Sequence, residues 1–393
     1  MAKKTIKIHN RSDKPDNIVM RQYEIEQECL SIEKELPQFM SGYFSYLKSN
    51  VLPLTRLNYL KDVRFFCQYL IDETALTEAT RPRDITQKEF NEIKAVDVNM
   101  FIDWCREYTV EKDEVITVYE NSNKTLARKK SSVSVLFKQL YRDDLLDKNI
   151  TDGFNPIRVQ KATEREIKAM QDDEVMIMLD AVTHGTNLTG RERSFWEKTK
   201  KRDKAILILF LTYGLRLFEL QQLNVSSFNF QRGEFKIYRK RDKEAVMPLN
   251  VSVTQAVRDY IDNERPKEED IPEEHREALF LSLQKKRMTE RSIRELVKKY
   301  TSIGMSTSRK GGYSPHKLRA TAATSLIGRG NSIFDVQALL DHEQVTTTQL
   351  YASHKMNVKR DLVRDMEWEL ERREGTGDDG NVEVKIEGND ENE

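Results

Sequence analysis

The 393-residue chain has only three cysteines, Cys29, Cys67 and Cys105, and they are not spaced like metal ligands. This argues against a disulfide framework and against a zinc site, and it favours a reduced, cytoplasmic setting. The sequence also lacks any stretch that approaches the ~18 apolar residues of a membrane span. Its N-terminus, Met-Ala-Lys-Lys, has no apolar run behind it, so we expect no secretory signal. We therefore expect neither a metal nor a membrane.

A net charge is absent as well, because 65 Lys and Arg balance 65 Asp and Glu. The balance hides an uneven distribution, since residues 374–393 contain eight acidic side chains and one basic side chain. We expect this Gly- and acid-rich tail to be disordered. The rest of the chain has 64 basic and 57 acidic residues, a net charge of +7. A moderately basic body suits nucleic-acid binding, although scattered surface lysines would give the same value.

Apolar periodicity divides the chain, which is long enough for two domains and shows no internal repeat. We expect a flexible N-terminal arm over residues 1–30 and a helical bundle over residues 31–154. Residues 155–168 are charged and aperiodic, which indicates a linker. A second domain is expected over residues 169–373, before the tail at 374–393.

The second domain combines helical patterns with a strand pattern. Residues 202–220 include a long apolar run, which indicates a core helix, and Gly214 can end it. From Phe228 to Val246, aromatic and β-branched residues alternate with polar ones, as in short antiparallel strands. The predicted fold class is mainly α with a small antiparallel β-sheet: an N-terminal helical bundle followed by an α+β domain.

One helix of the bundle has a basic N-terminal half, which reads K-T-L-A-R-K-K-S-S from Lys124. Lys, Arg and Ser side chains can contact a phosphate backbone, and a simply solvated helix face is the alternative. The candidates for DNA contact are Lys124, Arg128, Lys129, Ser131 and Ser132.

The densest group of chemically capable residues begins near Ser314. Ser314 suits a helix N-cap and Pro315 the first helical position, so a helix is expected to start here. His316 and Arg319 are three residues apart and would share one face of its first turn. Arginine can grip a phosphate with two parallel hydrogen bonds, and histidine can donate to it or move a proton. Each residue alone could equally be an ordinary surface group.

Two further residues extend this group. A second helix is expected from Ser332 to about Asp341, with His342 at its C-terminal end and Tyr351 nine residues later. A tyrosine is a poor nucleophile until cations and bases surround it. The joint spacing of the imidazoles, the guanidinium and the phenol fits the needs of a single anion.

A third candidate segment follows Gly214, where Arg216 and Glu219 form R-x-x-E-L. A charged arginine that leaves a core helix must meet an anion or bear a large desolvation cost. Glu219 could be that anion, in which case the two residues form a structural ion pair. Residues 239–243, R-K-R-D-K, form a basic hairpin tip, for which solvation alone is the usual meaning.

These motifs resemble the signature of the tyrosine recombinases, the phage-integrase and Xer family. The resemblance rests on H-K-L-R-A-T at residues 316–321, L-L-D-H at 339–342 and T-T-Q-L-Y at 347–351. The R-x-x-E-L motif resembles the family's first box. Asp341 departs from the pattern, which usually has glycine there, and Ala320 stands where many members carry a second histidine.

The resemblance implies roles for individual residues. Tyr351 would be the nucleophile that forms a 3′-phosphotyrosyl bond, while Arg216 and Arg319 would hold the non-bridging oxygens. The register with Pro248 matches Lys240 to the family's catalytic lysine, the general acid, with Lys243 as the alternative.

Supporting roles follow from the same resemblance. His316 would assist proton transfer, His342 would donate to the phosphate, and Glu219 would brace the site. Arg239 and Arg241, which flank the lysine, are candidate DNA contacts. No metal or ATP would be needed, because the covalent bond conserves the phosphodiester energy.

The family's architecture implies a helical core-binding bundle that clamps one side of double-stranded DNA, with an α+β catalytic domain on the other. It further implies a homo-tetramer on a specific site, a Holliday junction, exchange of a C-terminal helix between protomers, and action on the bacterial nucleoid. Other functions stay open: a type IB topoisomerase that relaxes supercoils, a non-catalytic DNA-binding regulator, or a helical scaffold.

Overall fold

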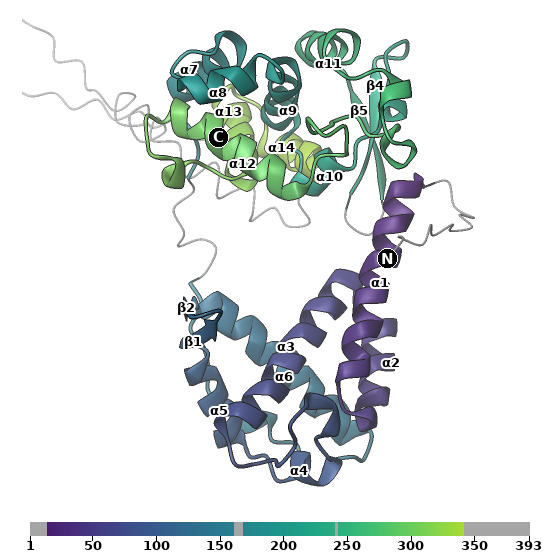
Figure 1. Cartoon of the computed structure of the whole chain (residues 1–393), viewed down its shortest axis with the longest axis vertical. Helices are drawn as coiled ribbons and strands as arrows, with labels where there is room; N and C mark the ends of the chain where they lie inside the picture. Colours follow the sequence, from purple (N-terminus) through teal and green to yellow (C-terminus); the bar gives the residue numbers. More distant parts are fainter. Residues whose placement is uncertain (1–13, 161–167, 240–242, 342–393) are drawn as a thin grey trace, which may run out of the picture.

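The computed structural model describes residues 14–160, 168–239 and 243–341, which form two lobes (Figure 1). The N-terminal lobe ends at Phe154 and the C-terminal lobe begins at Met170, and each has a hydrophobic core of its own. No helix among the described residues is long and apolar enough to cross a membrane.

The N-terminal lobe is a helical bundle with one β-hairpin. Phenylalanines of four helices meet in its core, where Phe66 packs against Phe90, Phe101 and Phe137. Its main elements are α1 (Asp16–Glu35), α2 (Ser41–Asn50), α3 (Pro53–Glu73), α4 (Gln87–Asn91), α5 (Ala95–Trp104), β1 (Glu107–Lys112), β2 (Val115–Glu120) and α6 (Asn123–Arg142).

Helix α1 corrects the expectation of a flexible arm over residues 1–30 from Asp16 onward, while residues 1–13 lie outside the described part of the chain. The chain is helical from Asp16 to Glu35, and Ile18, Cys29 and Ile32 are buried. These positions belong to a stripe spaced three and four residues apart that also contains Gln22, which hid it from a search for apolar residues. Ion pairs between α1 and the neighbouring helices α2 and α3 add to the contacts that this weak apolar stripe makes.

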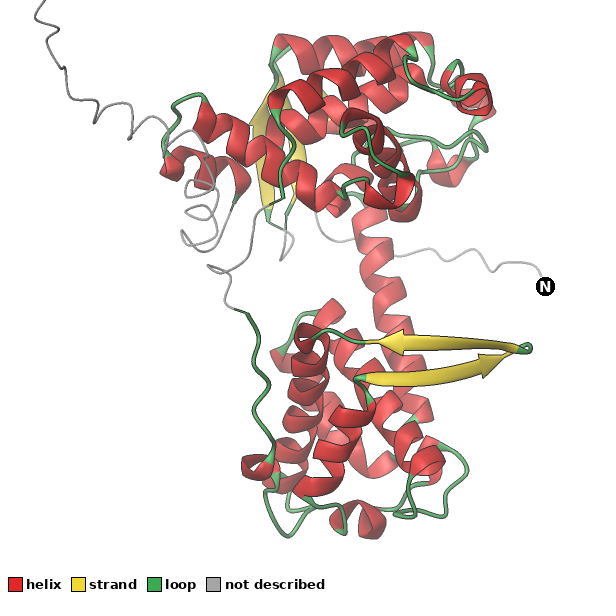
Figure 2. Cartoon of the chain, turned by 90° about the vertical axis from the view of Figure 1, so that its left-hand side faces the viewer, coloured by secondary structure: helices red, strands yellow, loops and turns green. Residues whose placement is uncertain are grey.

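The hairpin of β1 and β2 was not expected from the sequence. Asp113 and Glu114 form its two-residue turn with φ of 51° and 63°, the conformation that closes tight hairpins. Every residue of β2 is exposed, and the hairpin extends away from the helices in Figure 2. Apolar residues occur on both faces of the hairpin, so the usual alternation of buried and exposed positions gave no clear strand signal.

The C-terminal lobe confirms the predicted fold class of helices with a small antiparallel sheet. Strands β3, β4 and β5 pair in that order, with Phe235 opposite both Phe228 and Met247. Its main elements are α7 (Asp172–His184), α8 (Gly190–Trp196), α9 (Lys200–Tyr213), α10 (Leu217–Gln221), β3 (Phe228–Asn229), β4 (Glu234–Tyr238), β5 (Glu244–Pro248), α11 (Val251–Asn263), α12 (Glu290–Gly304), α13 (Pro315–Gly328) and α14 (Ile333–Leu340).

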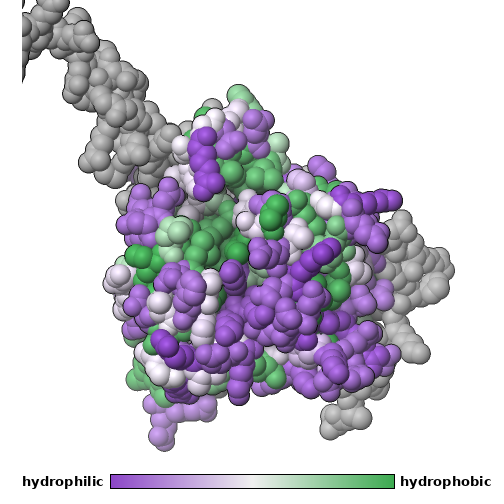
Figure 3. Space-filling model, turned by 90° about the horizontal axis from the view of Figure 1, so that it is seen from above, coloured by the Kyte–Doolittle hydropathy of each residue, from purple (hydrophilic) through white to green (hydrophobic). Residues whose placement is uncertain are grey.

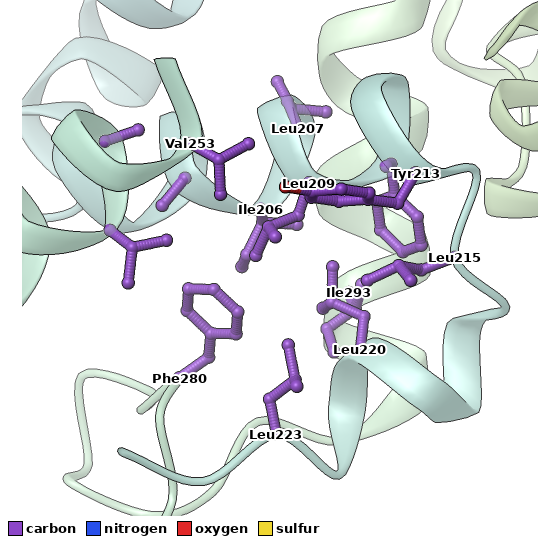
Figure 4. Packing of buried hydrophobic residues seen from close by; sticks show 14 of the residues in the cluster. Ile206, Leu207, Leu209, Tyr213, Leu215, Leu220, Leu223, Val253, Phe280 and Ile293 are labelled. Atoms are coloured by element: carbon purple, nitrogen blue, oxygen red, sulfur yellow. The ribbon is translucent and has the colours of Figure 1, made fainter. Parts of the chain in front are cut away.

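Helix α9 lies at the centre of this lobe. Its residues Ile206, Leu209 and Tyr213 pack with Val253 of α11 and Ile293 of α12 (Figure 4). It packs against α7, α11 and α13, and every one of its residues is buried or half-buried. The apolar run of the sequence therefore lies in the core. Seen from above in Figure 3, the surface of the molecule is largely hydrophilic with hydrophobic residues between.

The predicted end of the apolar helix at Gly214 is confirmed, and a second, short helix follows within residues 202–220. Helix α9 ends at Tyr213, and Gly214 has a φ of 55° before α10 starts at Leu217. A Cβ atom at Gly214 would lie 2.5 Å from Leu340 Cδ2 and 3.4 Å from Arg319 Cγ. Glycine is thus required both for its left-handed conformation and for the close approach of α13 and α14.

Candidate active site

Arg319 connects the three segments that form the candidate site. It lies on the first turns of α13, which begins at Pro315 with Ser314 at the N-cap position, and it is 4% exposed. Its Nη1 donates to the carbonyl oxygen of Gly214 at 2.6 Å, and its Nη2 donates to that of Leu340. The guanidinium is therefore held by the end of α9 and the end of α14.

Arg216, two residues after Gly214, is also held in place by hydrogen bonds. Its backbone N–H and its Nη1 donate to the two carboxylate oxygens of Glu219, each at 2.8 Å, and Glu219 is buried. Its Nη2 donates to the carbonyl oxygen of Asp341 at 3.0 Å. Because Arg319 and Arg216 bind the consecutive carbonyls of Leu340 and Asp341, the structure brings the two guanidinium groups to one place.

His316 lies one turn before Arg319 on α13, and its side chain is partly exposed and partly covered by protein. Its pKa is lowered from the ordinary value of 6.5 by desolvation and then by the positive charges of Arg319, Lys124 and Arg216. The imidazole is therefore mostly neutral at pH 7. Lys124 belongs to the N-terminal lobe, so both lobes contribute charge to this site.

Asp341 ends α14 in a left-handed conformation, with φ of 52° and ψ of 53°. Its carboxylate oxygens lie 3.9 Å from Nη1 of Arg216 and 3.6 Å from Nη1 of Arg239. Glycine adopts this backbone conformation at no steric cost, and aspartate is one of the few other residues that visit it. The departure from the usual glycine therefore keeps the backbone and adds a negative charge.

Arg239 differs from the prediction of a DNA contact on a solvated hairpin tip. The side chain is 7% exposed, its Nη2 donates to the carbonyl of Leu339 at 2.8 Å, and it also approaches the Sδ of Met247. The signal was present in the strand alternation, because Phe235, Ile237 and Arg239 follow one another at a period of two. Arg239 therefore lies on the same, buried face of the sheet as Phe235 and Ile237, beneath α14 and next to Asp341.

The prediction of a DNA contact is wrong for two residues of α6. Lys129 is buried, lies over the ring of Phe65 at 3.9 Å and pairs with Asp62, and burial lowers its pKa. Ser132 is fully buried and donates to the same carboxylate at 2.8 Å. The sequence pattern did not reveal Asp62, a buried acid on α3 that attracts these groups into the bundle.

The other candidates on α6 remain available to a ligand. Lys124 is exposed at the start of the helix, and Ser131 is exposed while donating to the carbonyl of Ala127 at 2.9 Å. Arg128 is 44% exposed and also pairs with Asp62. These three residues stay predicted contacts.

Several predicted residues lie outside the part of the chain that the structure describes. They are Lys240, Arg241, His342, Tyr351, and the residues of the expected C-terminal helix and acidic tail. Lys243, the alternative to Lys240, is described and exposed immediately before β5, where its carbonyl accepts from the backbone N–H of Arg239 at 2.8 Å. Within the described ranges there is no group of acidic, histidine and cysteine residues that could hold a metal.

Comparisons with known proteins decide the family. The model of the phage integrase family matches residues 168–357. A tyrosine recombinase XerC of Caldanaerobacter subterraneus is 30% identical over 329 residues, which cover 82% of this chain and 84% of that protein. This chain belongs to the tyrosine recombinase family. A second relative, the XerC of Natranaerobius thermophilus, is 34% identical over 236 residues, which cover 59% of this recombinase and 72% of the relative.

Solved structures show the same fold. The Tn1549 transposon integrase in complex with circular intermediate DNA matches 83% of the recombinase and 99% of that chain, with 20% identity and a TM-score of 0.53. XerH bound to difH in a pre-cleavage complex matches 91% of each chain, with 16% identity and a TM-score of 0.53. Family membership makes this recombinase an enzyme of site-specific recombination.

Proposed function

We propose that this recombinase cleaves and rejoins double-stranded DNA at a specific site through a 3′-phosphotyrosyl intermediate. The observation that supports the proposal best is the binding of Arg216 and Arg319 to the consecutive carbonyls of Leu340 and Asp341. Fixed guanidinium groups suit the charge that develops on a phosphate during displacement, because they need no reorganisation at the moment of reaction.

In the proposed reaction the phenol oxygen of Tyr351 attacks the scissile phosphorus. The bond from phosphorus to the 5′ oxygen breaks, and Lys240 gives a proton to that leaving oxygen. The phenol proton leaves with assistance from His316, whose lowered pKa favours the neutral, proton-accepting form. Attack by a new 5′ hydroxyl reverses the step and restores the tyrosine, so the exchange needs no net input of energy.

The remaining residues bind and position the phosphate. Arg216 and Arg319 hold its non-bridging oxygens, His342 donates to it, and Glu219 keeps Arg216 in place through two hydrogen bonds. The duplex lies between the lobes, where Lys124 of α6 is near enough to His316 to lower its pKa.

Strand exchange on this proposal proceeds through a Holliday junction in a homo-tetramer whose C-terminal helices are exchanged between protomers. The relatives named XerC and XerD and the structure of a transposon integrase support a role in resolution or in the movement of a bacterial element. Such a role places the protein on the nucleoid.

A nicked suicide substrate tests the proposal. The substrate is drawn from DNA that flanks the gene and carries a nick close to the cleavage site. The protein should form a covalent adduct on it, and Tyr351→Phe should form none. DNA binding without an adduct would indicate a non-catalytic regulator, and relaxation of supercoiled plasmid that lacks the site would indicate a topoisomerase.

A further inference from the structure

Helix α1 joins the two lobes a second time, in addition to the covalent connection. The 20-residue helix spans about 30 Å and runs from the bundle to the C-terminal lobe (Figures 1 and 2). Its C-terminal half is tied to the N-terminal lobe by acidic side chains. The ion pairs are Glu26 and Glu33 with Arg56, Glu28 with Lys61, Glu35 with Arg64, and Glu26 with Lys48.

The first turns of α1 contact the C-terminal lobe next to the active site. Arg21 donates to Oε1 of Glu290 at 2.9 Å, and its guanidinium carbon lies 3.9 Å from the ring centre of Phe218. Asn17 donates to the carbonyl of Gln222 at 3.2 Å and accepts from Nδ2 of Asn224 at 3.0 Å. Phe218 lies two residues after Arg216, so α1 is attached to the segment that carries an active-site arginine.

The covalent connection lies on the other side. Arg158 is bound near the start of α6 by Asn123, and Met170 enters the C-terminal lobe by donating its N–H to Thr321 on α13. Helix α3 packs against both α1 and α6, so within the bundle it lies between α1 and the helix at whose start the covalent connection is bound. Figure 1 shows α1 on the right and residues 155–160 on the left.

The charge of α1 argues against a role in gripping DNA. The helix has six acidic and two basic residues, so phosphates would repel it. Its hydrogen bonds to the C-terminal lobe come from polar side chains, and both partners of the Arg21–Glu290 pair are 29% exposed. Such a contact can open without unfolding either core.

We propose that α1 is a strap that closes the two lobes into a ring around duplex DNA, and that its first turns must release the C-terminal lobe before DNA without free ends can enter. This inference rests on the proposed function, because it requires a duplex between the lobes. The strap would let the recombinase hold a long or circular molecule between successive strand exchanges.

A cross-link across the contact tests the strap. Asn17→Cys with Gln222→Cys, joined by a short bis-maleimide, would lock the ring, and the three native cysteines are buried and poorly reactive. The substrates are one duplex with open ends and the same duplex with bulky blocked ends. Locking before DNA is added should leave binding of the open duplex within twofold and reduce binding of the blocked duplex by more than tenfold, to an extent that depends on the yield of cross-link.

The matched control is Glu28→Cys with Lys61→Cys, which locks α1 to its own lobe and should affect neither substrate. Equal binding of the locked protein to open and blocked duplexes would overturn the strap, and so would loss of both, since a closed ring still admits an open end. Failure of the uncross-linked protein to bind either duplex would instead count against the proposed function.

Exchanging the charges of the Arg21–Glu290 ion pair gives a second, independent test, in which the rates of loading and release are measured. Arg21→Glu should speed both loading onto and release from circular DNA by about fivefold, the size expected of one partly exposed ion pair. Adding Glu290→Arg should restore the slower rates. Arg64→Glu, which breaks a pair between α1 and α3, is the control, and rates that change equally in Arg21→Glu and Arg64→Glu would contradict the strap.

Discussion

Asp341 adds a carboxylate to the site that we propose binds a phosphate. The carboxylate lies within 4 Å of Nη1 of both Arg216 and Arg239. Before DNA binds, it offsets part of the positive charge of these guanidinium groups, and a phosphate must compete with it. We therefore expect the residue to affect phosphate affinity rather than the backbone, which already has the left-handed conformation that glycine would take.

Replacing Asp341 with glycine should strengthen phosphate binding while the end of α14 keeps its left-handed conformation. We expect covalent adduct formation on a nicked substrate to rise by about three- to tenfold at low salt, where the lost repulsion is least screened. Asp341→Asn is the matched variant, because asparagine also tolerates this conformation and removes only the charge. Unchanged or slower cleavage in both variants would show that the carboxylate does not compete with DNA.

His316 should couple DNA binding to pH. In the free protein its pKa is lowered, and a phosphate placed beside it would raise that pKa, so binding takes up a proton. Affinity should therefore increase as the pH falls from about 7.5 to about 5.5, and His316→Gln should flatten this dependence. The affinity of both proteins, measured across this range, checks the prediction, and parallel curves would contradict it.

At the scale of elements, the site depends on how closely α9, α13 and α14 approach at Gly214. The carbonyl of Gly214 holds Arg319, while its α-carbon faces Leu340. The spacing between these helices thus decides where the arginine sits.

Gly214→Ala should lower the free energy of unfolding of the C-terminal lobe by about 2 kcal/mol or more, through backbone strain and the clash with Leu340. Gly233→Ala is the control, because Gly233 also has a positive φ of 68° but has no atom within 4 Å of an added Cβ. Denaturant unfolding of both variants separates the backbone strain from the clash with Leu340. Equal losses of stability would mean that the helices adjust to the methyl group.

At the scale of the whole molecule, the basic residues of α6 divide into groups that face outward and groups that the bundle buries. Lys124 is exposed and its charge helps to lower the pKa of His316, whereas Lys129 is held by Asp62 and Phe65. Of these two lysines, we expect only Lys124 to release counterions from a phosphate backbone.

Lys124→Ala should weaken DNA binding and reduce the slope of log affinity against log salt concentration by about 0.9, the value for one lost phosphate contact. Lys129→Met, which keeps the volume of the buried side chain, should leave the slope unchanged. Binding measured at several salt concentrations tests both variants. A reduced slope in Lys129→Met would restore that residue as a DNA contact.

The sequence by itself determined the residues that depend on local geometry. His316 and Arg319 share a helix turn, Arg216 and Glu219 are three apart, and Gly214 ends a helix, so short-range spacing was enough to predict them. The small sheet followed from the alternation along β4 and β5 for the same reason.

Tertiary structure alone decided the features that depend on partners far along the chain. Lys129 is withdrawn from the surface by Asp62, 67 positions earlier, and Arg239 is drawn under α14 by the carbonyl of Leu339, 100 positions later. Helix α1 has too weak an apolar stripe to be recognised alone, and it is held by acids that pair with α2 and α3 and by polar contacts with the other lobe. Spacing within a segment specifies which side chains share a face, but only the packed chain specifies what that face meets.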